Sequence, residues 1–396
     1  MNPFHIYDNI YNMFTTLLLF IIILGLLVFV HEFGHFFAAK KLGAKVDEFG
    51  FGFPPRMVGV YRVGKKWKWT FRKTPKIKQT IYSLNWIPLG GFVKIKGEEG
   101  TEKDEPDSFA SKSIGKRAII LVAGVTMNVI LAMVILSIGF GIGIPQAIGD
   151  KMSPRAIIKD RNIQIVSVLK DSMADKAGIE SGDEVLALDG RKVNFKEMQD
   201  YLTGKVGEKV TYTIKRDDET IEKKIVPSIL EETGKGGIGV GLVEIGVVSY
   251  PWYLAIWKGI MEAFFYIKEI AIAFGTLFKN LFVGKGVSVD LSGPVGIAVI
   301  TGKVARMGLI YLMQFTAILS VNLAIINVFP FPALDGGRLL FLAIEKIRNK
   351  PVSQRIESTI HNLGFALLMI LIVTITARDF MKFGDKFLNL WQSIIQ

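Results

Sequence analysis

Apolar runs of near membrane-spanning length alternate with polar segments along the chain. These runs lie within residues 1–40, 118–145, 309–337 and 360–378. A helix needs roughly 20 predominantly apolar residues to cross a bilayer, and the last run reaches that length only if it extends beyond 363–376. The pattern predicts a polytopic α-helical membrane protein with about four transmembrane helices.

The segments between these runs follow other patterns. Within 41–117, aromatic residues alternate with basic or polar ones at 67–72, which predicts a membrane-associated β-hairpin or sheet region. Residues 150–240 are less apolar, and AGIESGDEVLALDGRKV (177–193) resembles the central signature of PDZ domains. We therefore expect an inserted PDZ-like α+β domain, with a strand pair at 209–226 around Asp217 and Asp218, and a C-terminal tail at 379–396.

Residues 250–300 contain an apolar stretch, 251–283, that also carries charge. Its charged residues include Lys258, Glu262, Lys268 and Glu269. Such a helix can span the bilayer or lie in its interface as an amphipathic helix. The position expected for a candidate metal ligand, Asp335, favours the interfacial alternative.

Charge is distributed unevenly along the sequence. The net charge is +12, yet residues 1–39 contain no Lys or Arg, whereas residues 40–118 are rich in both. Because cytoplasmic segments beside membrane helices carry an excess of basic residues, this asymmetry predicts an external N-terminus and a cytoplasmic 40–118 segment. The basic composition therefore indicates no nucleic-acid partner, and the expected partner is the lipid bilayer.

The first apolar run leads into HEFGH (31–35). His31 and His35 are four residues apart, so on a helix they can bind one metal ion, and Glu32 beside them can serve as a general base. Since the chain has no Cys, any zinc must be held by His and carboxylate groups. The alternatives are a chance HExxH pattern and a secretory signal, but no basic residue precedes Lys40, which disfavours the signal.

Asp335, just after the third run, is the expected third ligand. It must lie at the same membrane depth as His31 and His35. With 250–300 interfacial and four spans, the chain returns to the cytoplasmic side before Asp335, whereas a fifth span would place it on the opposite face. Basic residues in the following loop agree with the cytoplasmic side: Arg338, Lys346, Arg348, Lys350 and Arg355. The alternative is a turn acid at a helix end.

Residues 46–60 alternate Gly with Phe at 49–53. We expect an apolar hairpin beside the metal with an unpaired edge, at which Gly50, Phe51, Gly52 and Phe53 hold a substrate as an added strand. The alternative is an ordinary strand turn.

HEFGH, the PDZ-like insert and NVFPFPALDGG (327–337) together resemble the site-2 protease family of intramembrane zinc metalloproteases over nearly the whole chain. FGFGFPPR, PLGGFVK and LSGPVGIA (291–298) are similar to segments of its bacterial members of the regulator-of-sigma-E type. By this resemblance, the site residues are the Zn2+ ligands His31, His35 and Asp335, the catalytic acid/base Glu32, and the substrate-binding residues Asn327, Pro330 and Pro332, with Asn322 a weaker match.

The chain departs from the regulator-of-sigma-E type in two ways. It has room for one PDZ domain where that type has two, which leaves the route of substrate selection in doubt. The second run contains AGVTMN (123–128), where Pro usually follows the Gly. Neither departure is expected to touch the metal; Gly124 is expected to serve close helix packing and Asn128 an interhelical hydrogen bond.

The resemblance implies an endopeptidase of the bacterial cytoplasmic (inner) membrane that cuts within transmembrane segments of single-span membrane proteins. Expected substrates are anti-sigma factors already trimmed by an upstream site-1 type protease, and leftover signal peptides. Both termini and the PDZ domain would be extracytoplasmic, with the active site near the cytoplasmic face. Two other classes are a metal-binding but inactive membrane scaffold that recruits partners through the PDZ-like domain, and a transporter or channel with an ion site at HEFGH. The complete HExxH with Asp335 disfavours the scaffold, and the scarcity of charge in the other spans disfavours the transporter.

Overall fold

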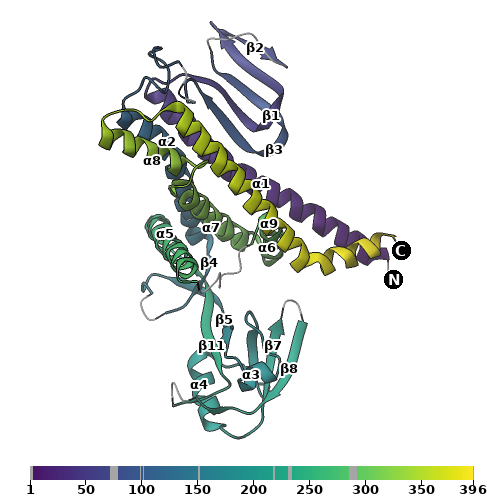
Figure 1. The fold of residues 1–396 in the computed structure, drawn as a ribbon. Helices are drawn as coiled ribbons and strands as arrows, with labels where there is room; N and C mark the ends of the chain where they lie inside the picture. Colours follow the sequence, from purple (N-terminus) through teal and green to yellow (C-terminus); the bar gives the residue numbers. More distant parts are fainter. Residues whose placement is uncertain are drawn as a thin grey trace. The chain divides into compact units, whose positions relative to one another are not determined.

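The computed structural model describes residues 3–71, 79–98, 100, 102–149, 152–216, 219–230, 234–284 and 292–395. The chain forms two compact units, of which one comprises Met1–Ser137 with Ile256–Gln396 and the other Ile138–Ala255. The first contains the long apolar helices and a small sheet, and the second contains the inserted β domain (Figure 1). The expected turn at Asp217 and Asp218, and Leu291 of LSGPVGIA, lie outside the described residues.

Four helices of the described chain are long and apolar enough to cross a membrane, in agreement with the sequence. They are α1 (Pro3–Lys41), α2 (Ile114–Ile142), α7 (Leu309–Val328) and α9 (Gln354–Ile395), whose apolar spans are Met13–Lys41, Ile114–Ile142, Leu309–Val328 and Gln354–Lys382. The structure differs from the short fourth run expected at 360–378 and the separate tail at 379–396. Helix α9 includes both because no proline interrupts it.

Three further helices follow the inserted domain. Helix α5 (Trp252–Phe282) is not among the four candidate spans, and α6 (Pro294–Met307) is a second helix within the expected interfacial region 250–300. The Gly293-Pro294 pair at the start of α6 is a common helix-start pattern. Helix α8 (Asp335–Arg348) replaces the loop expected after Asp335, and it buries Gly336, Gly337 and Leu342.

A small sheet lies between α1 and α2 in the sequence. Its strands β1 (Val46–Val63), β2 (Lys66–Thr70) and β3 (Ile81–Ile95) lie in the order β2-β1-β3, which agrees with the predicted β region. The unpaired edge expected at 49–53 is wrong for 49–51, and Phe53 is matched with Ile87. Each residue of 48–51 is matched with one residue of 91–94 and with another of 81–84, so two segments of β3 flank it. Strand β3 can do this because Gly90, at φ 80°, bends the chain between those segments.

The inserted β domain is built on a sheet of order β4-β11-β5-β6-β7-β8. Its elements are β4 (Ile144–Ala147), β5 (Ile157–Val168), α3 (Met173–Lys176), β6 (Glu184–Leu188), α4 (Phe195–Gly204), β7 (Val210–Arg216), β8 (Glu219–Ile225) and β11 (Val240–Ser249), with β9 (Ser228–Ile229) and β10 (Gly236–Gly237) paired separately. Side chains from the sheet and α4, including Met198, Tyr212 and Ile214, form one buried core. The sheet therefore extends beyond the expected boundaries of 150 and 240, although the α+β content agrees.

Candidate metal centre

Two histidines one helical turn apart on α1 form the centre of the site. His31 and His35 are buried, with 5% and 6% of their surface exposed. Their Nε2 atoms lie 3.1 Å apart, so both rings direct the same nitrogen toward one point. This is the arrangement predicted by the HEFGH spacing.

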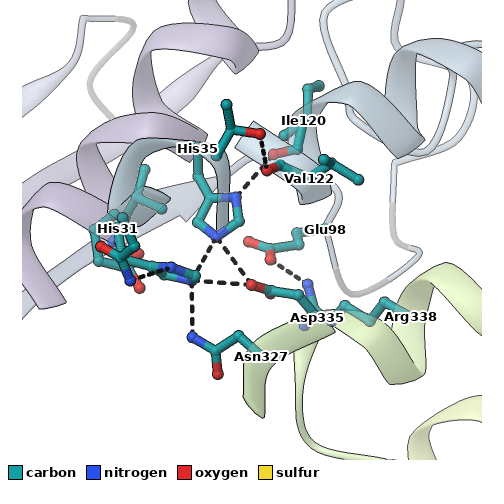
Figure 2. Close-up of polar contacts among 12 residues, drawn as sticks. His31, His35, Glu98, Ile120, Val122, Asn327, Asp335 and Arg338 are labelled. Atoms are coloured by element: carbon teal, nitrogen blue, oxygen red, sulfur yellow. Dashed lines mark hydrogen bonds and ion pairs between the residues drawn. The ribbon is translucent and has the colours of Figure 1, made fainter. Parts of the chain in front are cut away.

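Asp335 lies close to the two histidines although it is far from them in the sequence. It is the first residue of α8, after the loop 329–334 that follows α7. Its Oδ2 lies 2.9 Å from His31 Nε2 and 3.3 Å from His35 Nε2 (Figure 2). Gly337 permits α8 to start against this loop, since a Cβ there would lie 2.9 Å from the carbonyl carbon of Phe331. The structure therefore brings together the three side chains expected to share a metal.

These three donor atoms fit a zinc ion. Ligands placed roughly 2.0–2.1 Å from a tetrahedral zinc are about 3.3 Å from one another. The donor–donor distances here are 2.9, 3.1 and 3.3 Å. Two imidazole nitrogens and one carboxylate oxygen are also ligand types of catalytic zinc sites, which keep a further position open.

Helix α2 contacts the far side of both imidazoles. His35 Nδ1 lies 2.8 Å from the carbonyl oxygen of Ile120, and His31 Nδ1 lies 3.4 Å from Asn128 Nδ2. Between them, a Cβ at Gly124 would lie 2.7 Å from His35 Cε1 and 2.8 Å from His31 Cε1. The close packing expected at Gly124 and the interhelical contact expected of Asn128 are therefore confirmed, and both residues contact the candidate ligands themselves.

The orientation of the Asn128 amide matters for His31. Asn128 is fully buried, and its Oδ1 has no hydrogen-bond partner among the described residues. Oxygen and nitrogen of an amide exchange places without a change of shape. With Oδ1 turned toward His31, the Nδ1–H of that ring gains an acceptor and Nε2 is left free to bind a metal.

A cavity of about 290 Å³ opens onto the three candidate ligands. It is lined by Val28, His31, Glu32, Leu323, Asn327, Ala333, Leu334 and Asp335. Glu32 Oε2 accepts a hydrogen bond of 3.1 Å from the backbone N–H of Val93 in β3. Asn327 Nδ2, on α7, lies 3.4 Å from His31 Nε2 (Figure 2). A carboxylate and an amide thus face the cavity beside the histidines, each from a different helix.

The expected substrate-binding residues are divided between this cavity and its surroundings. Asn327 lines it, whereas Pro330 and Pro332 lie in the loop 329–334 without lining it. None of the β1 residues 50–53 lines it. The Val93 amide and the Ile120 carbonyl were not predicted, because backbone contacts cannot be inferred from residue type. The role of Gly34 was not predicted either. This residue of HEFGH lies where α1 crosses α2, and the HExxH motif does not specify the residue at that position.

The fold and the site define a membrane metalloprotease: apolar helices carry a clustered His, His and Asp donor set with a glutamate beside it. Residues 19–371 match the model of peptidase family M50, and the chain belongs to this family, the site-2 proteases. Membrane proteolysis that depends on zinc is the general activity of the class.

Two zinc metalloproteases of similar sequence support the same assignment. The zinc metalloprotease RasP of Geobacillus kaustophilus (strain HTA426) is 30% identical in an alignment 446 positions long, gaps included, that covers 92% of this chain and 97% of that protein. A provisionally named zinc metalloprotease of Clostridium perfringens (strain 13 / Type A) is 33% identical over 357 residues, or 89% of this chain and 95% of that one. Among solved structures, the PDZ domain of an SdrC-like protein from Listeria innocua is 26% identical, covers 20% of this chain and 92% of that chain, and has a TM-score of 0.19. The chain is accordingly a zinc metalloprotease.

Proposed function

We propose that this metalloprotease hydrolyses peptide bonds within the transmembrane segments of single-span membrane proteins. The observation that carries the proposal is the meeting of His31, His35 and Asp335, whose donor atoms lie within 3.3 Å of one another although Asp335 is 304 residues from His31. Both parts of the chain adjoin candidate spans, Met13–Lys41 and Leu309–Val328. Because the three ligands lie near the ends of these spans, a peptide bond that reaches them belongs to a substrate segment that enters the membrane.

His31, His35 and Asp335 are the proposed zinc ligands. Zinc supplies Lewis-acid polarisation of the scissile carbonyl and lowers the pKa of a water toward neutrality. The Glu32 carboxylate accepts a proton from the attacking water as the C–O bond forms, and passes it to the leaving amine as the C–N bond breaks. The Val93 N–H holds one carboxylate oxygen of Glu32 in place, which leaves the other for this transfer.

The substrate must offer an extended backbone, because a helix hides its carbonyl groups in internal hydrogen bonds. We propose that Asn327, Pro330 and Pro332 hold that extended segment, with the Asn327 amide beside the reacting carbonyl. The segment Gly50, Phe51, Gly52 and Phe53 is also proposed to contact the substrate. The contact is made by the rings of Phe51 and Phe53, which are 39% and 43% exposed. Strand addition at 48–51 is excluded from the proposal because both sides of that segment are paired.

We propose a four-span arrangement in the bacterial cytoplasmic membrane. Both termini and the inserted domain lie outside the cytoplasm, and the site lies near the cytoplasmic face, since basic residues are concentrated in 40–118. An inserted domain on that side suits a filter for substrates such as anti-sigma factors that an upstream site-1 type protease has already trimmed, and for leftover signal peptides. In this proposal the domain is PDZ-like and captures extended peptide or excludes bulky ectodomains.

Mass spectrometry of candidate single-span substrates, incubated with the purified protein in detergent, tests this function. We expect cuts inside the apolar segment that a chelator stops and that Glu32→Gln abolishes. Glu269→Gln on α5, an exposed carboxylate away from the cavity, is the matched control and should cut normally. A wild type without chelator-sensitive cleavage would favour the scaffold alternative, and an active Glu32→Gln variant would refute the assigned role of Glu32.

A further inference from the structure

We propose that His361, on α9, is a positioning residue for the cavity, a role that rests on the proposed function of that cavity. Its Nδ1 accepts a hydrogen bond of 2.9 Å from the backbone N–H of Ala333. Ala333 belongs to the loop 329–334 and lines the cavity next to Asp335. A helix that contributes none of the proposed catalytic groups thereby fixes the wall of the site.

The hydrogen bond holds Ala333 in a conformation that the residue does not favour. The φ of Ala333 is +82°, in the left-handed region where a Cβ is strained. Such a conformation persists when its surroundings impose it. The amide–imidazole bond is one such restraint, because an Ala333 N–H turned away from His361 would lose its acceptor in a partly buried site.

Two neighbouring contacts orient His361 toward the loop. One helical turn further along α9, Gly364 packs against the loop, since a Cβ there would lie 2.7 Å from the carbonyl oxygen of Pro332. The His361 ring also packs on Phe341 of α8, with 5.5 Å between the ring centroids. Its Nε2 is buried and has no hydrogen-bond partner in the described part of the chain. The polar contact that defines the ring orientation is therefore the one to Ala333.

The same loop joins α7, which carries Asn327, to α8, which begins with Asp335. Its own hydrogen bonds are short-range, from Phe331 N–H to Phe329 O at 2.7 Å and from Leu334 N–H to Phe331 O at 3.2 Å. Those turns fix the local shape of the loop but do not anchor it to another helix. At the start of the loop, Phe329 stacks on Phe278 of α5, with 5.0 Å between the ring centroids. His361 and Gly364 anchor the Pro332–Ala333 end to α9, so loss of the His361 acceptor should shift the cavity wall there and weaken substrate binding.

Paired substitutions of His361 separate this role from packing. His361→Phe keeps the ring and removes the acceptor, whereas His361→Asn keeps an acceptor at nearly the position of Nδ1. We expect His361→Phe to lower kcat/KM by about tenfold, mainly through a higher KM, and His361→Asn to retain most of the activity. Asn362→Ala, an exposed neighbour on the same helix, is the control and should behave as wild type. Zinc content is measured on each sample, so that activity lost through loss of zinc is distinguished from activity lost through weaker substrate binding.

Hydrogen exchange of the 329–336 segment in the full-length protein gives a second readout that needs no activity. We expect faster exchange in His361→Phe and wild-type exchange in His361→Asn. If His361→Phe does not fold, His361→Leu, a smaller side chain without an acceptor, takes its place. Unchanged exchange and KM in the variant without an acceptor, or equal losses in the Phe and Asn variants, would overturn the proposal. A wild type that exchanges as expected but cleaves no membrane substrate would refute the proposed function and leave the anchoring contact established.

Discussion

Gly124 of α2 offers a direct test of the metal centre, because its missing side chain makes room for both histidines. In Gly124→Ala the new methyl group would lie 2.7 Å from His35 Cε1 and 2.8 Å from His31 Cε1. The atom nearest to the new methyl group is His35 Nε2, the proposed ligand atom itself. Ordinary contact between non-bonded heavy atoms needs about 3.5 Å, so the rings or the helix must move by at least about 0.8 Å. Metal–ligand distances tolerate only about 0.2 Å of error. The substitution should therefore disturb the metal site first.

The expected magnitude follows from the overpacking. Ala is favoured over Gly inside a helix by up to about 1 kcal/mol, but this gain stabilises α2 with or without metal and cancels in the binding affinity. Overpacking typically costs about 1–3 kcal/mol, and here it falls on the two imidazoles. A cost of about 2 kcal/mol in metal binding corresponds to about a 30-fold weaker zinc affinity.

Zinc bound per protein, measured after dialysis against buffers of defined free zinc, gives this affinity directly. Gly115→Ala on the same helix is the matched control, because nothing lies within 4 Å of a Cβ at that position. It should bind zinc as wild type does. Wild-type zinc affinity in Gly124→Ala would refute the placement of both histidines against α2.

Three further substitutions test other contacts. Asn128→Leu removes the polar neighbour of the first imidazole and should weaken zinc binding by about tenfold, whereas the exposed Thr126→Val should not. Asp335→Asn removes a charged ligand and should lower zinc affinity by more than about 100-fold in the same titration. Asp183→Asn should destabilise the inserted domain by about 2–3 kcal/mol, because Arg216 binds both carboxylate oxygens at 2.7 Å, and amide exchange of β6 and β7 in the full-length protein measures this.

The Asp183 contact also predicts a dependence on pH. Burial by itself would raise the pKa of Asp183, but the hydrogen bonds from Arg216 and from the Glu180 N–H lower it below its ordinary value. A carboxyl group whose pKa falls on folding stabilises the fold above its unfolded pKa of about 4 and loses that contribution as the pH falls through the folded value. The difference in domain stability between wild type and Asp183→Asn should therefore be full at pH 7 and shrink below about pH 4. A difference that stays constant down to pH 2 would contradict this account.

Helix-encoded parts of the site could be predicted from the sequence alone. The spacing of His31 and His35 fixes their common face, and the apolar runs fix how often the chain crosses the bilayer. The role expected of Asp335 as third ligand decided between four spans and five, and its Oδ2 lies 2.9 Å from His31 Nε2. Helical spacing and the number of membrane crossings can be read from the sequence because both depend only on the positions of residues along the chain.

Other features depend on tertiary pairing that no local pattern encodes. The Phe and Gly alternation at 49–53 predicts a strand equally well at an edge or in the interior, and only the bend of β3 decides that both sides of 48–51 are paired. The bond between His361 and Ala333 joins two segments whose sequences give no hint of each other. A helix start at Gly293-Pro294 was, by contrast, within reach of the sequence, because Pro is favoured in the first turn of a helix.

The crossing of α1 and α2 links helix association to the geometry of the site. A Cβ at Gly34, inside HEFGH, would lie 2.7 Å from the carbonyl carbon of Ala123 and 2.9 Å from the Cα of Gly124. In a bilayer, helices associate through close packing and polar contacts rather than through the hydrophobic effect, so small residues at a crossing hold the helices together. At this crossing the same closeness brings the Ile120 carbonyl and Asn128 to the histidine rings. Any substitution that separates the two helices should therefore weaken metal binding and helix packing together, whereas a change confined to a ligand, such as Asp335→Asn, should weaken metal binding alone.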